Sequence, residues 1–258
     1  AGFTMVGPYY GAPPQRALLD HAAAAGLSVV YSIGFDAVRS PNEIEDDIAA
    51  QVASVVDHPA VNMWYVLPEE LKPWDARALR YLDRVATSIR VHDAQLRPIL
   101  NYQPNHRETP ELTTASAPLS TVMRGIYTNY VGATDQRGWV RWSTEQVVGA
   151  TARQRTPWVV LEMFEQPPAA RTAEIPGWVR HDVYASLLAG ARGILVFSGW
   201  PRSGFDAYED YLRAYLQVAT ELNGAEGLAD PLLRGRDAVG PIVRVVEGPP
   251  RIRVSTPQ

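Results

Sequence analysis

Two glutamates each follow an apolar segment of the sequence, a placement that suits acid–base chemistry at the edge of a sheet. Glu69 comes after the segment VNMWYVLP, and Glu162 comes after PWVVL. Two carboxyl groups that flank one bond can share the work of glycoside hydrolysis. One protonates the leaving oxygen, and the other attacks the sugar or stabilises its cation. Glu70 and Glu165 lie close by in the sequence and are reserve candidates for these roles.

The arginine content of the chain offers a second interpretation of these glutamates. Lys72 is the only lysine among 24 basic residues, so arginine is the common partner for carboxylates. Strand-end glutamates also form structural ion pairs, and either glutamate taken alone fits that role. Their joint presence favours catalysis, because other strand ends carry flat rings and amides that suit a sugar. These candidate substrate-binding residues are Tyr10, Asn101, Tyr102, Tyr127, Asn129 and Trp200.

Short apolar runs alternate with longer segments of helical composition along most of the chain. The runs predict strands at residues 3–10, 27–34, 61–68, 98–103, 121–130, 157–164 and 193–199. The longer segments predict helices at residues 14–25, 43–57, 75–94, 144–155, 177–191 and 205–223. Residues 104–120 and 131–143 have the composition of loops. In the second loop, Trp139 and Trp142 would form either a sugar platform or a hydrophobic latch that closes the loop.

Repeated β/α units with apolar strands predict an α/β fold of the TIM-type (β/α) barrel class. Only seven units are strong, so the eighth strand is either absent on the N-terminal side or supplied by the tail. A doubly wound open sheet is the alternative, but the sequence contains neither the G-x-G-x-x-G nor the phosphate-loop pattern. In a barrel the C-terminal ends of the strands meet at one mouth, which would bring the two glutamates to the same site.

The sequence predicts a barrel domain over residues 1–223 and a C-terminal extension over residues 224–258. The extension is rich in glycine and proline and contains two β-like runs, 242–246 (IVRVV) and 251–254 (RIRV). A Gly-Pro-Pro segment separates the two runs, so we expect them to form a β-hairpin.

Composition excludes several kinds of chemistry. The chain has 258 residues and no cysteine, which excludes disulfides, thiolate metal sites and a cysteine nucleophile. Its five histidines form no H-x-x-x-H or H-E-x-x-H pattern, so we expect no metal and no cofactor. The net charge is −4 without a long basic stretch, so nucleic acid is not an expected partner.

The sequence was also read for targeting signals and for apolar runs that could cross a membrane. No apolar run reaches the length of a membrane span, so we expect no membrane association. We expect no signal peptide in this sequence. Localisation stays open, with a secreted or periplasmic place favoured over the cytoplasm, and the sequence assigns no oligomeric state. The expected partner is a carbohydrate substrate.

Several segments together resemble clan A glycoside hydrolases, which are retaining (β/α)8-barrel enzymes. The run 64–70 (WYVLPEE) resembles their fourth strand, which ends at the acid/base glutamate. The run 157–162 (PWVVLE) is similar to their seventh strand, which ends at the nucleophile, and 190–200 (GARGILVFSGW) is similar to their eighth. Residues 18–30 are similar to a helix and strand of these enzymes. The resemblance covers residues 3–200 in strand order and implies that the family's first strand is missing here.

The resemblance implies a role for each of the candidate residues. Glu69 would be the acid/base, with Glu70 in reserve, and Glu162 would be the nucleophile that attacks an oligo- or polysaccharide. Trp200 would form the floor or wall of the subsite for the attacked sugar. This sequence departs from the family at Pro68, where the family has an asparagine that contacts the sugar's 2-hydroxyl.

Two other functions stay open on the sequence alone. The first is a degenerate barrel that binds carbohydrate without turnover, which Pro68 and the missing strand favour. The second is a non-glycosidase barrel enzyme, such as a lyase or isomerase, that uses glutamate and tyrosine as acid and base.

Overall fold

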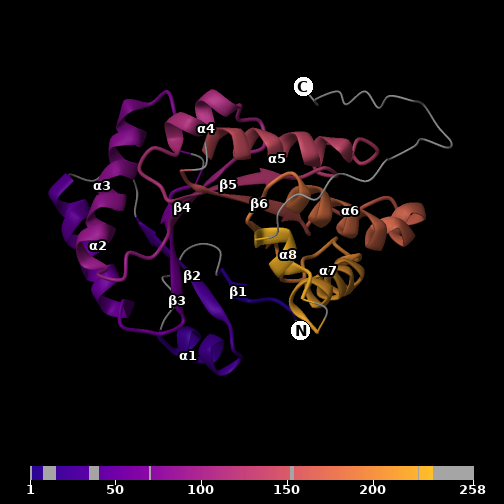
Figure 1. The fold of residues 1–258 in the computed structure, drawn as a ribbon, viewed down its shortest axis with the longest axis horizontal. Helices are drawn as coiled ribbons and strands as arrows, with labels where there is room; N and C mark the ends of the chain where they lie inside the picture. The colour runs from indigo at the N-terminus through magenta and orange to yellow at the C-terminus, as the bar shows by residue number, and fades with distance from the viewer. Residues whose placement is uncertain are drawn as a thin grey trace. The chain divides into compact units, whose positions relative to one another are not determined.

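The computed structural model describes residues 2–7, 16–34, 41–69, 71–151, 154–225 and 227–234, and Figure 1 shows the fold. The chain divides into two compact units. The first unit consists of Phe3–Gly125 and Gln146–Val159, and the second consists of Ala1–Gly2, Ile126–Glu145 and Val160–Gln258. Glu69 therefore belongs to the first unit, and Glu162 belongs to the second.

Seven strands form one sheet in which each strand lies beside the next one in the chain. They are β1 (Met5–Val6), β2 (Ser28–Gly34), β3 (Val61–Leu67), β4 (Ile99–Gln103), β5 (Thr121–Ile126), β6 (Thr156–Glu162) and β7 (Gly193–Phe197). The sheet order is β1-β2-β3-β4-β5-β6-β7, and the four pairs from β1 to β5 are parallel. Parallel neighbours need crossover connections, and helices supply them here. The predicted α/β fold with seven successive strands is confirmed, whereas closure into a barrel stays a prediction.

Helices α1 to α6 lie in the connections between the strands, and α7 and α8 follow β7. They are α1 (Arg16–Ala24), α2 (Pro41–Val55), α3 (Ala76–His92), α4 (Thr109–Ala115), α5 (Gly138–Thr151), α6 (Ile175–Leu188), α7 (Tyr208–Asn223) and α8 (Ala229–Arg234). A 3-10 helix, η1 (Ala169–Glu174), precedes α6. Five predicted helices correspond to α1, α2, α3, α6 and α7, with ends that differ by a few residues.

The prediction of a loop over residues 104–120 is wrong, because α4 lies within it. Proline and threonine give this segment the composition of a loop, but Pro110 stands in the first helical turn, where a missing N–H group costs nothing. The Glu111 carboxylate accepts a hydrogen bond from the Glu108 backbone N–H at 3.1 Å, and this contact stabilises the start of the helix.

The prediction of a loop over residues 131–143 is also wrong in its second half. Helix α5 begins at Gly138, so both Trp139 and Trp142 are helical. Trp139 is buried, which excludes its use as an exposed sugar platform. A tryptophan-rich segment after a strand therefore marks a packed helix start here.

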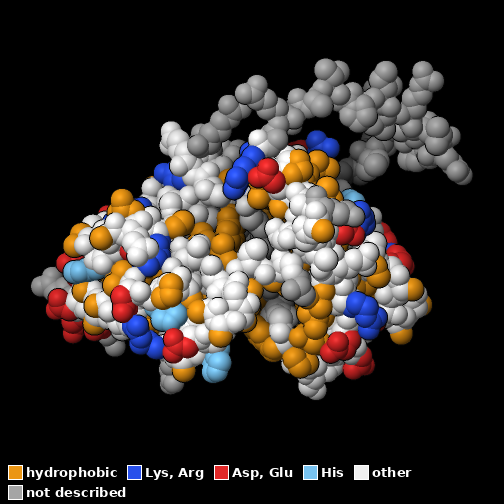
Figure 2. All heavy atoms as spheres, turned by 60° about the horizontal axis from the view of Figure 1, so that its bottom comes forward, with side chains coloured by type: hydrophobic (Ala, Val, Ile, Leu, Met, Phe, Trp, Pro, Cys, Tyr) orange, Lys and Arg blue, Asp and Glu red, His pale blue; other side chains and the backbone are white. Residues whose placement is uncertain are grey.

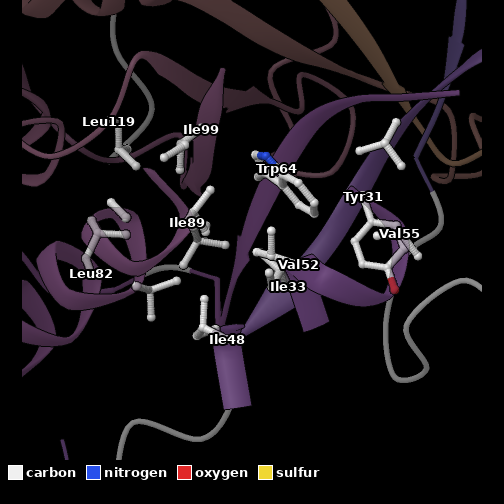
Figure 3. Close-up of a cluster of buried hydrophobic side chains, with 14 of the residues drawn as sticks. Tyr31, Ile33, Ile48, Val52, Val55, Trp64, Leu82, Ile89, Ile99 and Leu119 are labelled. Atoms are coloured by element: carbon white, nitrogen blue, oxygen red, sulfur yellow. The ribbon is translucent and has the colours of Figure 1, made fainter. Parts of the chain in front are cut away.

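The core of the first unit forms between its strands and the helices α2 and α3, which pack side by side (Figure 1). Figure 3 shows Ile48 and Val52 of α2 and Leu82 and Ile89 of α3 within one buried cluster with strand residues. Each such side chain contributes about 1.5–3 kcal/mol through removal from water. Spacing by multiples of three and four residues places these residues on one face of each helix.

Trp64 is fully buried in this cluster and has a polar partner for its indole N–H (Figure 3). Its Nε1 donates to Asp93 Oδ2 at 2.8 Å, and Arg97 Nη1 donates to Asp93 Oδ1 at 2.7 Å. The ring of Tyr31 meets the Trp64 indole edge-on, with centroids 5.8 Å apart. Trp64 is thus a core residue of the first unit.

Strands β2 and β3 approach closely at their C-terminal ends because position 34 is a glycine. Gly34 has a φ of 131°, and a Cβ there would lie 2.3 Å from the Leu67 carbonyl oxygen. The Tyr81 hydroxyl donates to the same carbonyl oxygen. Any other residue at position 34 would displace the end of β3, two residues before Glu69.

Two other predicted features are only partly covered by the described residues. Strand β1 contains two residues instead of the predicted 3–10, and Tyr10 lies outside the described residues. Helix α8 occupies the start of the predicted C-terminal extension. The runs 242–246 and 251–254, predicted to form a hairpin, also lie outside the described residues.

Candidate functional site

Glu162 ends β6, and its carboxylate is held by backbone groups of the second unit. Its Oε2 accepts from the Asn129 N–H at 2.8 Å, and its Oε1 accepts from the Tyr130 N–H at 3.2 Å. Two consecutive amides after β5 therefore face one carboxyl group at the end of β6. The residue is 6% exposed, so this carboxyl has little contact with water.

Burial raises the pKa of Glu162 to about 8. The two backbone N–H donors and the Arg137 guanidinium act in the opposite direction, because they stabilise the charged form. The nearby charge of Glu165 raises the pKa further, although by less than burial does. The geometry thus fixes the position of the carboxyl, and its environment gives it a high affinity for a proton.

A buried polar network supports the segment that holds Glu162. Arg137 Nη1 donates to Thr128 Oγ1 at 2.6 Å and to Asp182 Oδ2 at 2.9 Å. Arg137 Nη2 donates to Asn129 Oδ1 at 3.4 Å. One guanidinium therefore contacts two successive residues of the segment after β5 and a carboxylate on α6.

Helix α7 contributes two tyrosines to the same region. The Tyr211 hydroxyl accepts from Asn129 Nδ2 at 2.7 Å, and the Tyr215 hydroxyl donates to the Glu162 carbonyl oxygen at 3.0 Å. Burial raises the pKa of both tyrosines above its ordinary value, so both stay neutral. Tyr215 therefore fixes the backbone at Glu162, and Tyr211 fixes the side chain of Asn129.

Aromatic rings form a continuous cluster next to this segment; we call it the aromatic cluster. Its members are Tyr127, Tyr130, Phe164, Phe197 and Trp200. Successive ring centroids lie 5.1 Å (Tyr127–Phe164), 5.4 Å (Phe164–Phe197) and 5.7 Å (Phe197–Trp200) apart. Tyr130 is 64% exposed and Trp200 is 41% exposed. The cluster therefore presents flat apolar faces to solvent, and such faces suit the C–H face of a sugar.

Arg202 lies over three rings of the aromatic cluster. Its guanidinium carbon is 5.4 Å from the centroid of Phe164, 5.1 Å from Phe197 and 4.9 Å from Trp200. Its Nη2 donates to Ser198 Oγ. Among the residues that the structure describes, no carboxylate forms an ion pair with Arg202, so its charge is balanced only by rings and a hydroxyl.

The first unit places the other predicted site residues around the end of β3. Glu69 follows the strand by two residues and is half-buried. Asn101 Nδ2 donates to the Val66 carbonyl oxygen at 2.8 Å and to the Pro68 carbonyl oxygen at 3.1 Å. Gln103 Nε2 in turn donates to Asn101 Oδ1 at 2.9 Å. Asn101 therefore positions the backbone that leads to Glu69.

Tyr102 is also buried, and it packs against the backbone of β5. A Cβ at Gly125 would lie 2.2 Å from the Tyr102 hydroxyl oxygen. The Tyr102 ring can occupy this position only because the neighbouring strand has a glycine there. This packing and the burial of Asn101 give both residues a supporting position rather than an exposed one.

The predicted residues thus fall into two groups. In the second unit, Asn129 contacts Glu162 directly, and Tyr127 and Trp200 join the aromatic cluster. Glu165 is half-buried in the segment after β6. Glu69, Asn101 and Tyr102 belong to the first unit. Tyr10 and Glu70 lie outside the described residues.

Sequence reasoning missed Phe164, Arg137 and Arg202, and it placed Tyr130 at the end of a strand without a role in the site. The spacing Tyr127–Tyr130 and the position of Phe164 two residues after Glu162 were visible signals of ring placement. Arg137 gave no such signal, because its partners on α6 are far away in the sequence.

The described residues contain no group of three or more His, Asp or Glu side chains placed to hold a metal ion. No helix in the described ranges has the length and apolar character that a membrane crossing requires. Figure 2 shows acidic and basic side chains interspersed with apolar ones on the face in view.

Comparisons with known proteins identify a shared fold. No family model matches the sequence, and no curated protein sequence matches it either. Among solved structures, the β-D-glucuronidase of Dictyoglomus thermophilum is similar, with a TM-score of 0.58 and 13% identity over 77% of this chain and 38% of that one. The β-glucuronidase of Bifidobacterium dentium, in complex with coumarin-3-O-glucuronide, has a TM-score of 0.61 and 11% identity over 76% and 35%. A β-glucuronidase from an uncultured Clostridium species has a TM-score of 0.61 and 15% identity over 76% and 37%.

The chain therefore has the fold of a part of these glycoside hydrolases and spans between 35% and 38% of their length. The resemblance to glycosidases noted in the sequence is supported at the level of the fold, without assignment to one family.

Proposed function

We propose that this chain is a retaining glycoside hydrolase that acts through Glu69 and Glu162. The observation that carries the proposal is the placement of Glu162, a carboxyl fixed by two backbone amides at the end of a strand. The neighbouring aromatic cluster supports a sugar as ligand, since it has two solvent-exposed members. The fold shared with β-glucuronidases supports the same class of reaction.

In the proposed reaction, the Glu162 carboxylate attacks the anomeric carbon while Glu69 gives its proton to the leaving oxygen. The C–O bond to the leaving group breaks, and an ester to Glu162 forms. Glu69, now a carboxylate, then takes a proton from water, whose oxygen attacks the anomeric carbon and releases Glu162. Two inversions at one carbon leave the configuration of the sugar unchanged.

The environment of Glu162 constrains the pH at which this reaction proceeds. A pKa of about 8 leaves about a tenth of the Glu162 side chains ionised at pH 7. Attack requires the ionised form, so the proposed rate rises with pH up to about 8 as long as Glu69 keeps its proton.

Arg202 supports an acidic sugar as the substrate class. Arg202 is half-buried, and its guanidinium lies on the aromatic cluster and forms no ion pair with a described carboxylate. A sugar that stacks on Trp200 could bring a carboxylate to this cation. Among the structural neighbours, the Ruminococcus gnavus β-glucuronidase is in complex with D-glucuronic acid. We therefore propose a uronic acid glycoside over a neutral one.

A second candidate function is carbohydrate binding without turnover. Both oxygens of Glu162 accept backbone hydrogen bonds, and the residue is 6% exposed, which restricts its access to an anomeric carbon. Pro68 also occupies the position before Glu69 where the clan A glycoside hydrolases that the sequence resembles have an asparagine. These two features favour a binding protein that kept the fold and the aromatic cluster.

A screen of aryl glycosides at pH 6–9 tests both candidates. The panel contains 4-nitrophenyl glucuronide and the matching glucoside, and the enzyme is compared with Glu162→Gln. If the chain is a hydrolase, we expect turnover that Glu162→Gln abolishes and a preference for the glucuronide over the glucoside. The first product observed by NMR should be the anomer with retained configuration. Binding of glucuronic acid without turnover in either protein supports the second candidate. Glu165→Gln is the matched control and should keep most of the activity.

A further inference from the structure

We propose that Arg137 is a positioning residue for Glu162, which it holds in place through the backbone of the segment Thr128–Tyr130. This inference rests on the proposed role of Glu162 and adds a residue that neither the sequence nor the likeness to other proteins indicates. Arg137 itself donates no hydrogen bond to the Glu162 carboxyl. Its hydrogen bonds go to Thr128, Asn129 and Asp182.

The first step of the argument is the way in which the carboxyl is held. The two donors to Glu162 are main-chain N–H groups of Asn129 and Tyr130, so their direction is set by the backbone. These residues lie in a turn after β5, outside any helix or strand. Backbone hydrogen bonds from Ala133 N–H to the Thr128 carbonyl oxygen (2.7 Å) and from Gly132 N–H to the Asn129 carbonyl oxygen (2.9 Å) close this turn, and side-chain contacts add support to it.

Arg137, the residue before α5, supplies such contacts. Its Nη1 contacts Thr128 Oγ1 at 2.6 Å, and its Nη2 contacts Asn129 Oδ1 at 3.4 Å. The Asn129 amide also donates to the Tyr211 hydroxyl at 2.7 Å, which fixes the other end of this side chain. The planar guanidinium has donors in a fixed arrangement, and lysine cannot reproduce this geometry.

Arg137 is itself anchored on two sides. Asp182 of α6 accepts from its Nη1 at 2.9 Å, and the Trp178 ring of the same helix lies 4.6 Å from its guanidinium carbon. The side chains of Arg137 and Asp182 are 12% and 11% exposed. Water therefore screens this ion pair little, and the arginine is held in a single position.

The charged and titratable groups around Glu162 come from several elements. They are Arg137 immediately before α5, Asp182 and His181 on α6, Tyr211 and Tyr215 on α7, and Glu165 after β6. Among these groups, Arg137 is the one cation whose charge lowers the pKa of Glu162. Loss of Arg137 should therefore remove both a favourable charge and the support of the amides.

The chain contains a matched control for this arginine. Arg171 lies near the same Trp178 ring, 5.2 Å from its centroid. It pairs with Asp135 at 2.7 Å and with Glu174 at 2.8 Å, and it has no hydrogen bond to the Thr128–Tyr130 segment. Arg171→Met removes the same side chain from the same neighbourhood and leaves the Glu162 amides untouched.

The experiment is an NMR titration of the full chain without substrate, so it does not depend on catalysis. Carboxyl ¹³C signals report the pKa of Glu162, which Glu162→Gln assigns, and ¹H–¹⁵N spectra report the N–H groups of Asn129 and Tyr130. In Arg137→Met we expect the Glu162 pKa to rise by about one unit or more. We expect the two amide protons to move upfield, as they do when a carboxylate partner is lost. Arg171→Met should change neither signal.

Two further variants separate positioning from charge. Thr128→Val keeps the charge of Arg137 but removes the shorter of its two hydrogen bonds to the segment. We expect it to shift the Asn129 and Tyr130 amides and to raise the Glu162 pKa. Arg137→Lys should restore the wild-type values only in part. If Thr128→Val and Arg137→Lys both behave as wild type, the arginine acts by its charge alone, and the proposal is overturned.

Arg137→Met leaves the Asp182 carboxylate buried without its cation, which destabilises the folded variant. The double variant Arg137→Met/Asp182→Asn replaces the ion pair by two neutral side chains. This double variant should show the same shift of the Glu162 pKa and of the two amides. Unchanged signals in it would also overturn the proposal. The two proposals can fail separately. If the glycoside screen shows no turnover but the titration shows the expected shifts, the proposed function is wrong and the positioning of Glu162 by Arg137 stands.

Discussion

The two candidate carboxyls lie in different kinds of surroundings. Glu162 ends a strand, is buried, and is held by two backbone amides of a neighbouring segment. Glu69 follows the end of β3 and is half-buried, and the polar side chain near it, Asn101, contacts the backbone before it. In the second unit polar residues fix a side chain, whereas in the first they fix a strand end.

This difference suits the two proposed roles. A nucleophile must hold one oxygen in line with one carbon, so a fixed carboxyl has an advantage. An acid/base must give a proton to the leaving group and then take one from water, so it needs some access to solvent. Polar residues at the ends of strands are therefore not equivalent, and each contact decides what a residue does.

The largest expected effect comes from loss of the fixed carboxyl. Glu162→Ala should lower turnover of an aryl glucuronide on the order of 10⁴-fold, since no other group can form the ester. Sodium azide should restore part of the rate, because it can occupy the vacated position and attack in its place. Steady-state kinetics with and without azide provide the measurement. Unchanged turnover in this variant would contradict the assignment and favour Glu165.

The half-buried carboxyl should show a dependence on the leaving group. Glu69→Gln should lower the rate about 10²–10⁴-fold for an alkyl glycoside, whose leaving oxygen needs a proton. The rate for a dinitrophenyl glycoside should fall much less, because that leaving group departs as an anion. Parallel assays of both substrates test this. An equal loss on both would point to Glu70 or to a different mechanism.

The contrast in burial should also appear in the pH dependence of stability. The pKa of Glu162 in the folded state, about 8, lies above the value of 4.5 that an exposed glutamate has in the unfolded chain. Protonation therefore favours the folded state: this contribution is fully present below pH 4.5 and is lost as the pH rises to about 8. The total is on the order of 5 kcal/mol. Urea unfolding of wild type and Glu162→Gln at pH 5 and pH 8.5 should show a smaller drop in the variant.

The smallest expected effect concerns sugar stacking on the aromatic cluster. Trp200→Ala should weaken glucuronide binding by about 1–3 kcal/mol, by analogy with base stacking on aromatic side chains. Isothermal titration calorimetry measures the change. Trp74→Ala is the control, because Trp74 is an exposed tryptophan of the first unit that stacks on Arg107. Equal effects of both substitutions would argue against a specific subsite at Trp200.

The order of strands could be predicted well from the sequence, because each buried strand is a continuous apolar run. The strand ends at Leu67 and Glu162 agree with the prediction to within two residues. Helix α4 was missed because proline and threonine suit both a loop and a first helical turn. The start of α5 was missed because glycine and arginine precede its apolar residues.

The candidate site could be predicted only in part. Glu162 and Trp200 follow apolar strands, which is a local signal. The partners of Glu162 are not local: Asn129 lies 33 residues before it, and Arg137 acts on it through Thr128 and Asn129. Periodicity identifies what is buried, but it does not identify which polar groups meet after the chain has folded.

The sequential order of the seven strands has a consequence for the synthesis of the chain. When a strand leaves the ribosome, the neighbour with which it pairs has already been made and stands one connection away. The sheet can therefore grow one strand at a time from the N-terminal side, because no strand has to pair with a segment that is synthesised much later. A stalled ribosome would then carry a partial sheet whose newest strand has an open edge, and a chaperone would meet the protein in this form.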